Sequence, residues 1–105
     1  MSDLINSVLA RSRPQAIDLA QGDSLFRRGD AVVRFFQVLS GEIHVLRHLE
    51  NGAMLVQQRA RAGDFVSEPS LHSTSYHCDA VASQPSRLRG VDRAAMLAAL
   101  RAEPM

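Results

Sequence analysis

Residues 42–59 read EIHVLRHLENGAMLVQQR, and this stretch is the first indication of the fold class. Apolar and polar side chains alternate in its first half, which places Ile43 and Val45 on one face of a strand. The pair Asn51-Gly52 that follows is the strongest short signal for a hairpin turn in the chain. The stretch therefore predicts an antiparallel hairpin whose second strand covers residues 54–59.

Similar strand-like segments lie on both sides of this hairpin, separated by glycine-containing turns. The glycines are Gly22, Gly29, Gly41, Gly52 and Gly63. The other predicted strands cover residues 16–19, 24–26, 32–39, 76–82 and 86–91. Turn signals at such regular spacing are typical of an all-β sandwich or barrel. The segments between the glycines do not resemble one another, which argues against a solenoid of repeats.

A short helix is predicted at each end of the strand region. Residues 2–12 place Leu4, Ile5, Val8 and Leu9 on one helical face, and Pro14 ends the pattern. At the other end, Asp92 is a predicted N-cap for an alanine- and leucine-rich helix over residues 93–102. We therefore divide the chain into an N-terminal helical segment at 1–13 and one domain at 14–105.

Composition excludes several classes of protein. The chain has 105 residues, of which 46% are hydrophobic, so a single globular domain is expected. No apolar run is long enough to span a membrane, and the N-terminus lacks the features of a secretion signal. The single cysteine, Cys78, excludes a disulfide within the chain and indicates a reducing, cytoplasmic location. A net charge of +1 with scattered arginines does not indicate a nucleic-acid-binding face.

Three blocks of residues resemble the effector domain of the Crp/Fnr transcription regulators, which has the cyclic-nucleotide-binding fold. These blocks are GDSLFRRGD at 22–30, FQVLSGEI at 36–43, and Gly63-Asp64-Phe65 followed by Glu68. Their order and spacing agree with the family over residues 15–100. The resemblance implies a mainly β fold, a double-stranded antiparallel β-roll (jelly roll) with short flanking α-helices.

The same resemblance implies a ligand site in the segment that follows Gly63-Asp64. In the family's cyclic-nucleotide binders a glutamate accepts a hydrogen bond from the ribose and an arginine pairs with the cyclic phosphate. Glu68 matches that glutamate, but Tyr76 stands at the arginine position and His77 at the neighbouring hydroxyl position. We therefore expect weak or absent binding of cyclic AMP. The candidate ligand-binding residues are Ser67, Glu68, Pro69, Ser70, Tyr76, His77 and Cys78.

The implied function is that of an effector-sensing domain in a Crp/Fnr-like regulator. A small molecule of unspecified identity would control DNA binding by a C-terminal domain that this chain does not include. The full-length protein is expected to be a homodimer, because the family dimerises through a long helix after the β-roll. The chain alone is expected to associate weakly, with apolar surface exposed near Val38, Leu46 and Met96. The alternative is a stand-alone β-roll that binds a small molecule or a protein and has no role at DNA.

Catalytic and metal-binding interpretations find little support in the sequence. The chain has no phosphate-binding loop, nucleophile elbow or zinc-protease motif, so no catalytic residue is proposed and the protein is expected not to be an enzyme. The four histidines and Cys78 are ligand types for zinc or haem, but their spacing is poor, and we propose no metal site. Asp30 and Asp64 are interpreted as turn-forming residues. No cofactor is identified.

Overall fold

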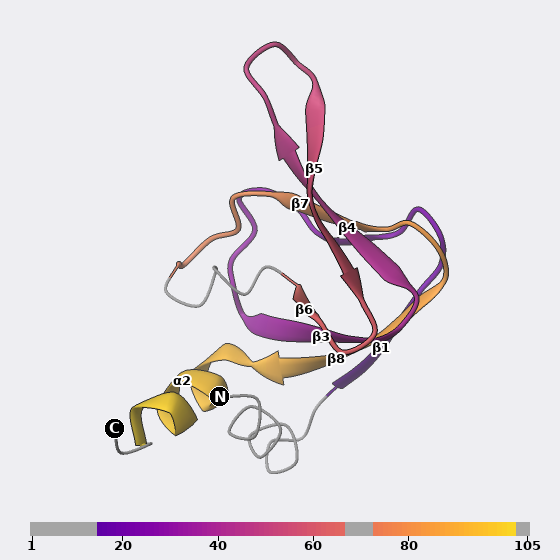
Figure 1. The fold of residues 1–105 in the computed structure, drawn as a ribbon. Coiled ribbons are helices and arrows are strands. Elements are labelled where there is room, and N and C mark those ends of the chain that lie inside the picture. Colours follow the sequence, from indigo (N-terminus) through magenta and orange to yellow (C-terminus); the bar gives the residue numbers. More distant parts are fainter. Residues whose placement is uncertain (1–14, 67–72, 103–105) are drawn as a thin grey trace.

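The computed structural model describes residues 15–66 and 73–102 of the chain, which form eight strands and one helix (Figure 1). In chain order these elements are β1 (Gln15–Leu19), β2 (Ser24–Phe26), β3 (Arg34–Ser40), β4 (Glu42–His48), β5 (Met54–Arg61), β6 (Phe65–Val66), β7 (Asp79–Ala82), β8 (Ser86–Asp92) and α2 (Arg93–Ala102).

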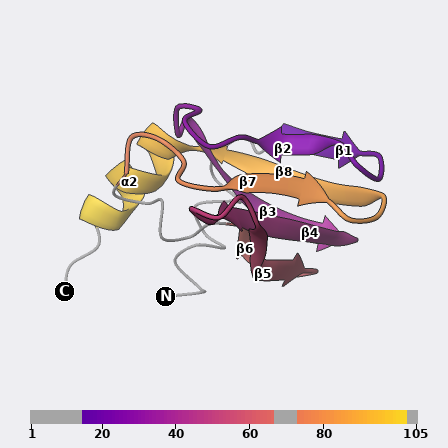
Figure 2. The same ribbon diagram turned by 90° about the horizontal axis from the view of Figure 1, so that it is seen from above.

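The strands form two antiparallel sheets of four strands each. One sheet has the order β1-β8-β3-β6, and the other has the order β2-β7-β4-β5. Figure 2 shows the strands side by side in these two orders. Apart from the consecutive strands β4 and β5, neighbouring strands of each sheet come from distant parts of the chain, as expected for a roll. The prediction of a mainly β, double-stranded antiparallel roll is therefore confirmed.

The chain crosses between the two sheets at tight corners that contact one another. Gly41 lies in the corner between β3 and β4, and this corner packs on the turn between β7 and β8. At the other crossings, the Gly22 N–H donates to the Ala82 carbonyl at 2.8 Å, and the Gly63 N–H donates to the Val38 carbonyl at 2.8 Å. All three glycines have a positive φ, close to 90°. The glycines noted in the sequence therefore stand where the roll turns its corners.

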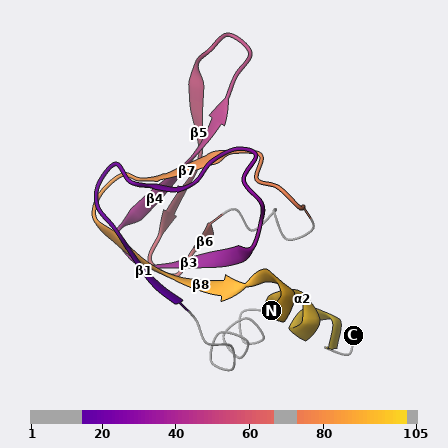
Figure 3. The ribbon, with the colours of Figure 1, turned by 180° about the vertical axis from the view of Figure 1, so that it is seen from behind.

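The predicted hairpin is present as β4 and β5. Their register runs from Glu42 opposite Arg61 to His48 opposite Met54, with an irregularity after Val45. The tip of this hairpin projects beyond the body of the roll (Figures 1 and 3). β5 extends two residues past its predicted end at position 59.

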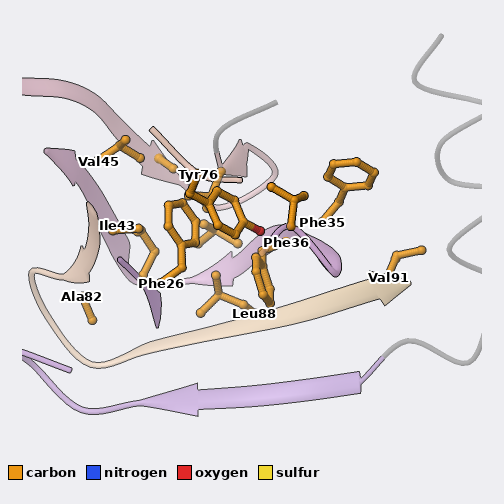
Figure 4. Close-up of a cluster of buried hydrophobic side chains, with 14 of the residues drawn as sticks. Phe26, Phe35, Phe36, Ile43, Val45, Tyr76, Ala82, Leu88 and Val91 are labelled. Carbon is orange, nitrogen blue, oxygen red and sulfur yellow. The ribbon is translucent and has the colours of Figure 1, made fainter. Parts of the chain in front are cut away.

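The core lies between the two sheets (Figure 4), and it includes Met96 of α2. Its largest fully buried side chains are Ile43, Leu88, Val38, Val45 and Val91. Met96 of α2 is also buried. The apolar surface expected near Val38 and Met96 is therefore not formed by these two side chains themselves, although Leu39, next to Val38, is 42% exposed. Both side chains pack into the chain's own core, and the nearby Leu46 is half-buried.

Two further predicted strand boundaries differ from the structure by two residues or more. The strand predicted at 76–82 is β7, and it begins at Asp79. Residues 75 and 76 instead bond to the turn at residues 30–31. β3 begins at Arg34, two residues later than predicted. β6 was not predicted, since two residues carry no periodicity.

The C-terminal helix has the predicted cap, because the Asp92 carboxylate accepts a hydrogen bond from the Ala95 N–H at 3.2 Å. The predicted helix at 2–12 lies outside the described residues. Among the helices that are described, none is long and apolar enough to cross a membrane.

Candidate functional site

The predicted ligand-binding residues fall into two groups. Ser67, Glu68, Pro69 and Ser70 lie outside the described residues. Tyr76, His77 and Cys78 lie in the segment that leads into β7. These three residues therefore lie at the end of the roll where β2, β3 and β7 meet.

Tyr76 is a buried residue that is only 5% exposed. Its ring stacks on Phe26 with a centroid distance of 3.6 Å and an angle of 7° between the planes (Figure 4). Its hydroxyl donates a hydrogen bond to the Arg34 carbonyl at 2.8 Å. Burial, followed by the negative charge of Asp30, raises the pKa of Tyr76 to about 12. The phenol is therefore neutral and bonded within the protein.

The backbone of Tyr76 is fixed by the turn at residues 27–30. The Tyr76 N–H donates to the Asp30 carbonyl at 2.9 Å, and the Tyr76 carbonyl accepts from the Gly29 N–H at 2.9 Å. The turn itself is closed by the Asp30 carboxylate, which accepts from the Arg27 N–H at 2.9 Å. Asp64 makes the same kind of bond to the Arg61 N–H. The interpretation of both aspartates as turn-forming residues is confirmed.

His77 and Cys78 occupy different surroundings. His77 is exposed, and its Nε2 lies 3.1 Å from the Ser73 hydroxyl. Cys78 is half-buried at the margin of the core, with its Sγ 3.6 Å from the Gln57 Oε1. Thus Tyr76 and Cys78 both contact the interior, whereas His77 faces solvent. This agrees with the expectation that neighbouring residues of an extended segment point in opposite directions.

Asp79 is a residue of this region to which the sequence analysis gave no role. One carboxylate oxygen accepts from the Arg28 N–H at 2.7 Å, and the other lies 2.7 Å from the Nε2 of His48. The Arg28 N–H and then His48 hold the pKa of Asp79 below its ordinary value. Asp79 therefore links the turn behind Tyr76 to His48, the last residue of β4 before the hairpin turn. Its partners are 31 and 51 residues away in sequence, so no local pattern could reveal them.

A second polar cluster lies at the other end of β4. Glu42 accepts from the Arg61 Nε at 2.8 Å, and its other oxygen lies 2.6 Å from the His44 Nε2. These two bonds lower the pKa of Glu42. In residues 15–66 and 73–102, no three His, Cys, Asp or Glu side chains lie close enough together to hold a metal ion. His44 and His48 each have a carboxylate partner instead.

An open hollow of about 380 Å³ lies at the start of α2, apart from Tyr76. Polar and apolar groups line it in similar measure, from Val32, Val33, Asp92, Arg93, Ala94, Leu97 and Ala98. The Arg93 Nε is buried and has no hydrogen-bond partner in the described part of the chain. None of the predicted site residues contributes to this hollow.

Comparisons with known proteins agree with the geometry. Residues 16–103 match the family model described as the cyclic nucleotide-binding domain. DNR from Pseudomonas aeruginosa superposes with a TM-score of 0.83 at 21% identity, covering 99% of this chain and 46% of that one. The catabolite activator protein of Thermus thermophilus superposes with a TM-score of 0.79 at 24% identity, covering 96% of this chain and 47% of that one.

The c-di-GMP-responsive global regulator CLP from Xanthomonas campestris is similar as well, with a TM-score of 0.80 at 18% identity, covering 97% of this chain and 49% of that one. The chain thus spans about half the length of these three structures, and identities below 25% show a shared fold. Comparison with curated protein sequences gave no match.

Proposed function

Because this chain belongs to the cyclic nucleotide-binding domain family, we propose that it is the effector-sensing domain of a Crp/Fnr-like transcription regulator. A small molecule would bind in the cytoplasm beside Ser67, Glu68, Pro69 and Ser70 and the segment from Tyr76 to Cys78. Binding would control DNA contact by a separate domain of a homodimeric protein, without catalysis. The observation that best supports this proposal is the family match over residues 16–103, within a fold shared with full-length regulators.

The buried phenol of Tyr76 bears on the chemical class of the effector. Its hydroxyl is bonded to the Arg34 carbonyl and its ring is stacked on Phe26, so it offers no positive charge to a phosphate. The loss of a charge-assisted contact costs roughly 1.5–3 kcal/mol. We therefore propose an effector that is not held by the cyclic phosphate–arginine contact.

A route from this site to α2 follows from two hydrogen bonds on adjacent residues. Tyr76 bonds to the Arg34 carbonyl at 2.8 Å, and the Val33 carbonyl accepts from the N–H of Arg93, the first residue of α2, at 2.9 Å. A ligand that displaces the Tyr76 ring would therefore move residues 33–34, to which the first residue of α2 is hydrogen-bonded. We propose this connection as the means by which an effector changes the position of the helix.

The experiment is a thermal-shift and calorimetric screen of the chain against nucleotides and small metabolites, with native mass spectrometry of the protein purified under mild conditions. We expect one ligand class to raise the melting temperature of the protein. The Glu68→Gln variant should lose this effect, and the Asp18→Asn variant, changed at an exposed strand position, should retain it. A ligand that binds equally well to Glu68→Gln would place the site elsewhere. The absence of any ligand, together with DNA binding by the full-length protein that no metabolite alters, would contradict the proposed function.

A further inference from the structure

The hollow at the start of α2 contains a positive charge that the structure leaves unpaired. Arg93 is the first residue of α2 and lines this hollow. Its Nε is buried away from water and has no hydrogen-bond partner. Within residues 15–66 and 73–102, no carboxylate forms an ion pair with its guanidinium. A buried donor without an acceptor is rare in folded proteins, and a partly desolvated cation attracts an anion more strongly than a fully hydrated one.

Asp92 also lines the hollow, but its carboxylate is bonded to the helix. It accepts a hydrogen bond from the Ala95 N–H at 3.2 Å and is exposed. The backbone N–H of Arg93 is occupied as well, because it donates to the Val33 carbonyl at 2.9 Å. The first turn of α2 therefore satisfies these two backbone groups from within the chain. Among these groups, the one that still lacks a partner is the guanidinium of Arg93.

The apolar part of the lining indicates what else a ligand of this hollow would carry. Val33 is 55% exposed and Leu97 is half-buried, and the remaining apolar lining comes from Val32, Ala94 and Ala98. The volume of about 380 Å³ lies within the usual range of small-molecule sites, roughly 300–1,000 Å³. An inorganic anion would leave the apolar side chains in contact with water, whereas an organic anion would cover them. The lining therefore favours an organic anion.

We propose that the hollow at the start of α2 is a binding site for a small monocarboxylate with a short aliphatic chain. The carboxylate would accept two hydrogen bonds from the terminal nitrogens of Arg93, the paired geometry that guanidinium groups favour. The aliphatic chain would cover Val33 and Leu97. Because the Val33 carbonyl bonds to the Arg93 N–H, a ligand that contacts both residues would fasten α2 to the segment before β3. The site shares no residue with the predicted effector site and does not rest on the proposed function.

The first test separates the charge of the ligand from its aliphatic chain. Hexanoate is the probe, acetate lacks the longer chain, and hexanol lacks the charge. In an NMR titration of the isotope-labelled chain, millimolar hexanoate should shift the amide signals of Val33, Arg93 and Leu97. Acetate and hexanol should each bind at least tenfold more weakly, because each lacks one of the two kinds of contact. Equal binding of either control compound, or no shift with hexanoate, would overturn the proposal.

The second test changes the charges at the hollow. Arg93→Gln should weaken hexanoate binding at least tenfold, and Arg93→Lys should weaken it less, because lysine keeps the charge but loses the paired geometry. Arg59→Gln is the matched control, since Arg59 is an exposed arginine on β5 and should leave the affinity unchanged. Asp92→Asn should strengthen binding, because it removes a like charge while asparagine still caps the helix. Unchanged affinity of Arg93→Gln would place hexanoate elsewhere and overturn the proposal.

A third pair of variants leaves Arg93 in place, so the proposal stays testable even when Arg93→Gln does not fold. Val33→Glu adds a carboxylate of the chain itself at the hollow and should compete with hexanoate. Val33→Gln has nearly the same size without the charge and should bind hexanoate at least fivefold more tightly than Val33→Glu. Circular dichroism checks that both variants are folded. Equal affinities of the two variants would contradict the proposal, as would hydrogen exchange of the Arg93 N–H that hexanoate does not slow.

Discussion

Tyr76 and Phe26 lie face to face, with ring centroids 3.6 Å apart and planes inclined by 7°. Phe26 in turn packs on Phe36 with a centroid distance of 6.4 Å. Phe26 belongs to β2 in one sheet and Phe36 to β3 in the other, so this aromatic group joins the two sheets beneath the candidate site. Tyr76 is therefore part of the core as well as of the predicted site.

Removing the hydroxyl of Tyr76 should destabilise the protein without disturbing the ring stack. In Tyr76→Phe the Arg34 carbonyl loses its 2.8 Å donor, and we expect the free energy of unfolding to fall by about 1–2 kcal/mol. Tyr76→Ala also removes the ring from the core and should cost about 3–5 kcal/mol. Urea denaturation measures both values. Equal stability of Tyr76→Phe and the unchanged protein would show that this hydrogen bond contributes nothing.

The pKa of Tyr76 predicts loss of stability in alkaline solution. A pKa of about 12 in the folded state lies above the ordinary value of 10.0, so the fold favours the neutral phenol. This contribution is fully present below pH 10 and is lost as the pH rises towards 12, by roughly 3 kcal/mol. The melting temperature should therefore fall more steeply between pH 10 and 12 for the unchanged protein than for Tyr76→Phe. Parallel pH profiles for the two proteins would contradict this assignment.

Cyclic AMP should bind weakly or not at all. Titration calorimetry should give no heat corresponding to micromolar or tighter affinity, because the phosphate has no arginine at position 76. The double variant Tyr76→Arg with His77→Ser supplies the missing groups and should gain affinity if it folds. It should also be less stable, because a guanidinium replaces a phenol stacked on Phe26. Micromolar binding by the unchanged protein would show that other groups hold the phosphate.

Asp79 should make stability depend on acid pH. Its pKa is lowered mainly by the Arg28 N–H and then by His48, so its contribution is present above the ordinary carboxyl pKa and is lost as the pH falls below it. Asp79→Asn should lower the melting temperature at pH 7 and should make the decline below pH 4 shallower. Asp18→Asn is the control, since Asp18 has only a 3.4 Å ion pair with Arg87 at the surface. A similar effect of both changes would argue against a special role for Asp79.

The sequence predicted those parts of the fold that depend on local chemistry. Asn51-Gly52 and the alternation at 42–47 identified the hairpin, because turn type and strand period are set by adjacent residues. Asp92 marked the start of the helix for the same reason. The burial of Tyr76 was not predictable in this way, since the ring that covers it comes from position 26, 50 residues earlier.

The sequence also misjudged which apolar residues would be exposed. Exposed apolar surface was expected near Val38 and Met96, but these two side chains pack into the core. Three consecutive apolar residues on β5, Met54, Leu55 and Val56, are exposed instead, and Val33, Leu39 and Leu49 are exposed singly. Which sheet edge stays uncovered depends on the strand order, and the strand order is set by long-range pairing.

Gly41 lies at a corner of the roll and Gly52 in the β4–β5 turn, so alanine at these two positions tests whether packing at the corner also requires glycine. Both have a positive φ, 89° and 86°, so alanine at either position should cost about 1–2 kcal/mol in backbone strain. Only at Gly41 is the space also filled, because an added Cβ would lie 2.3 Å from the Ser86 Oγ and 2.5 Å from the Pro85 carbonyl oxygen.

Gly41→Ala should therefore cost about 3–5 kcal/mol in total, since the clash forces the β3–β4 corner away from the β7–β8 turn. It should also weaken the bond between the Glu42 N–H and the Ser86 Oγ, which is 3.0 Å long. At Gly52 nothing lies within 4 Å of the added atom, so only the backbone strain should appear. Thermal and urea unfolding of the two variants measure the difference directly. Equal losses of stability in the two variants would mean that the β3–β4 corner and the β7–β8 turn are not tightly packed. Backbone strain alone would then explain the glycine at position 41.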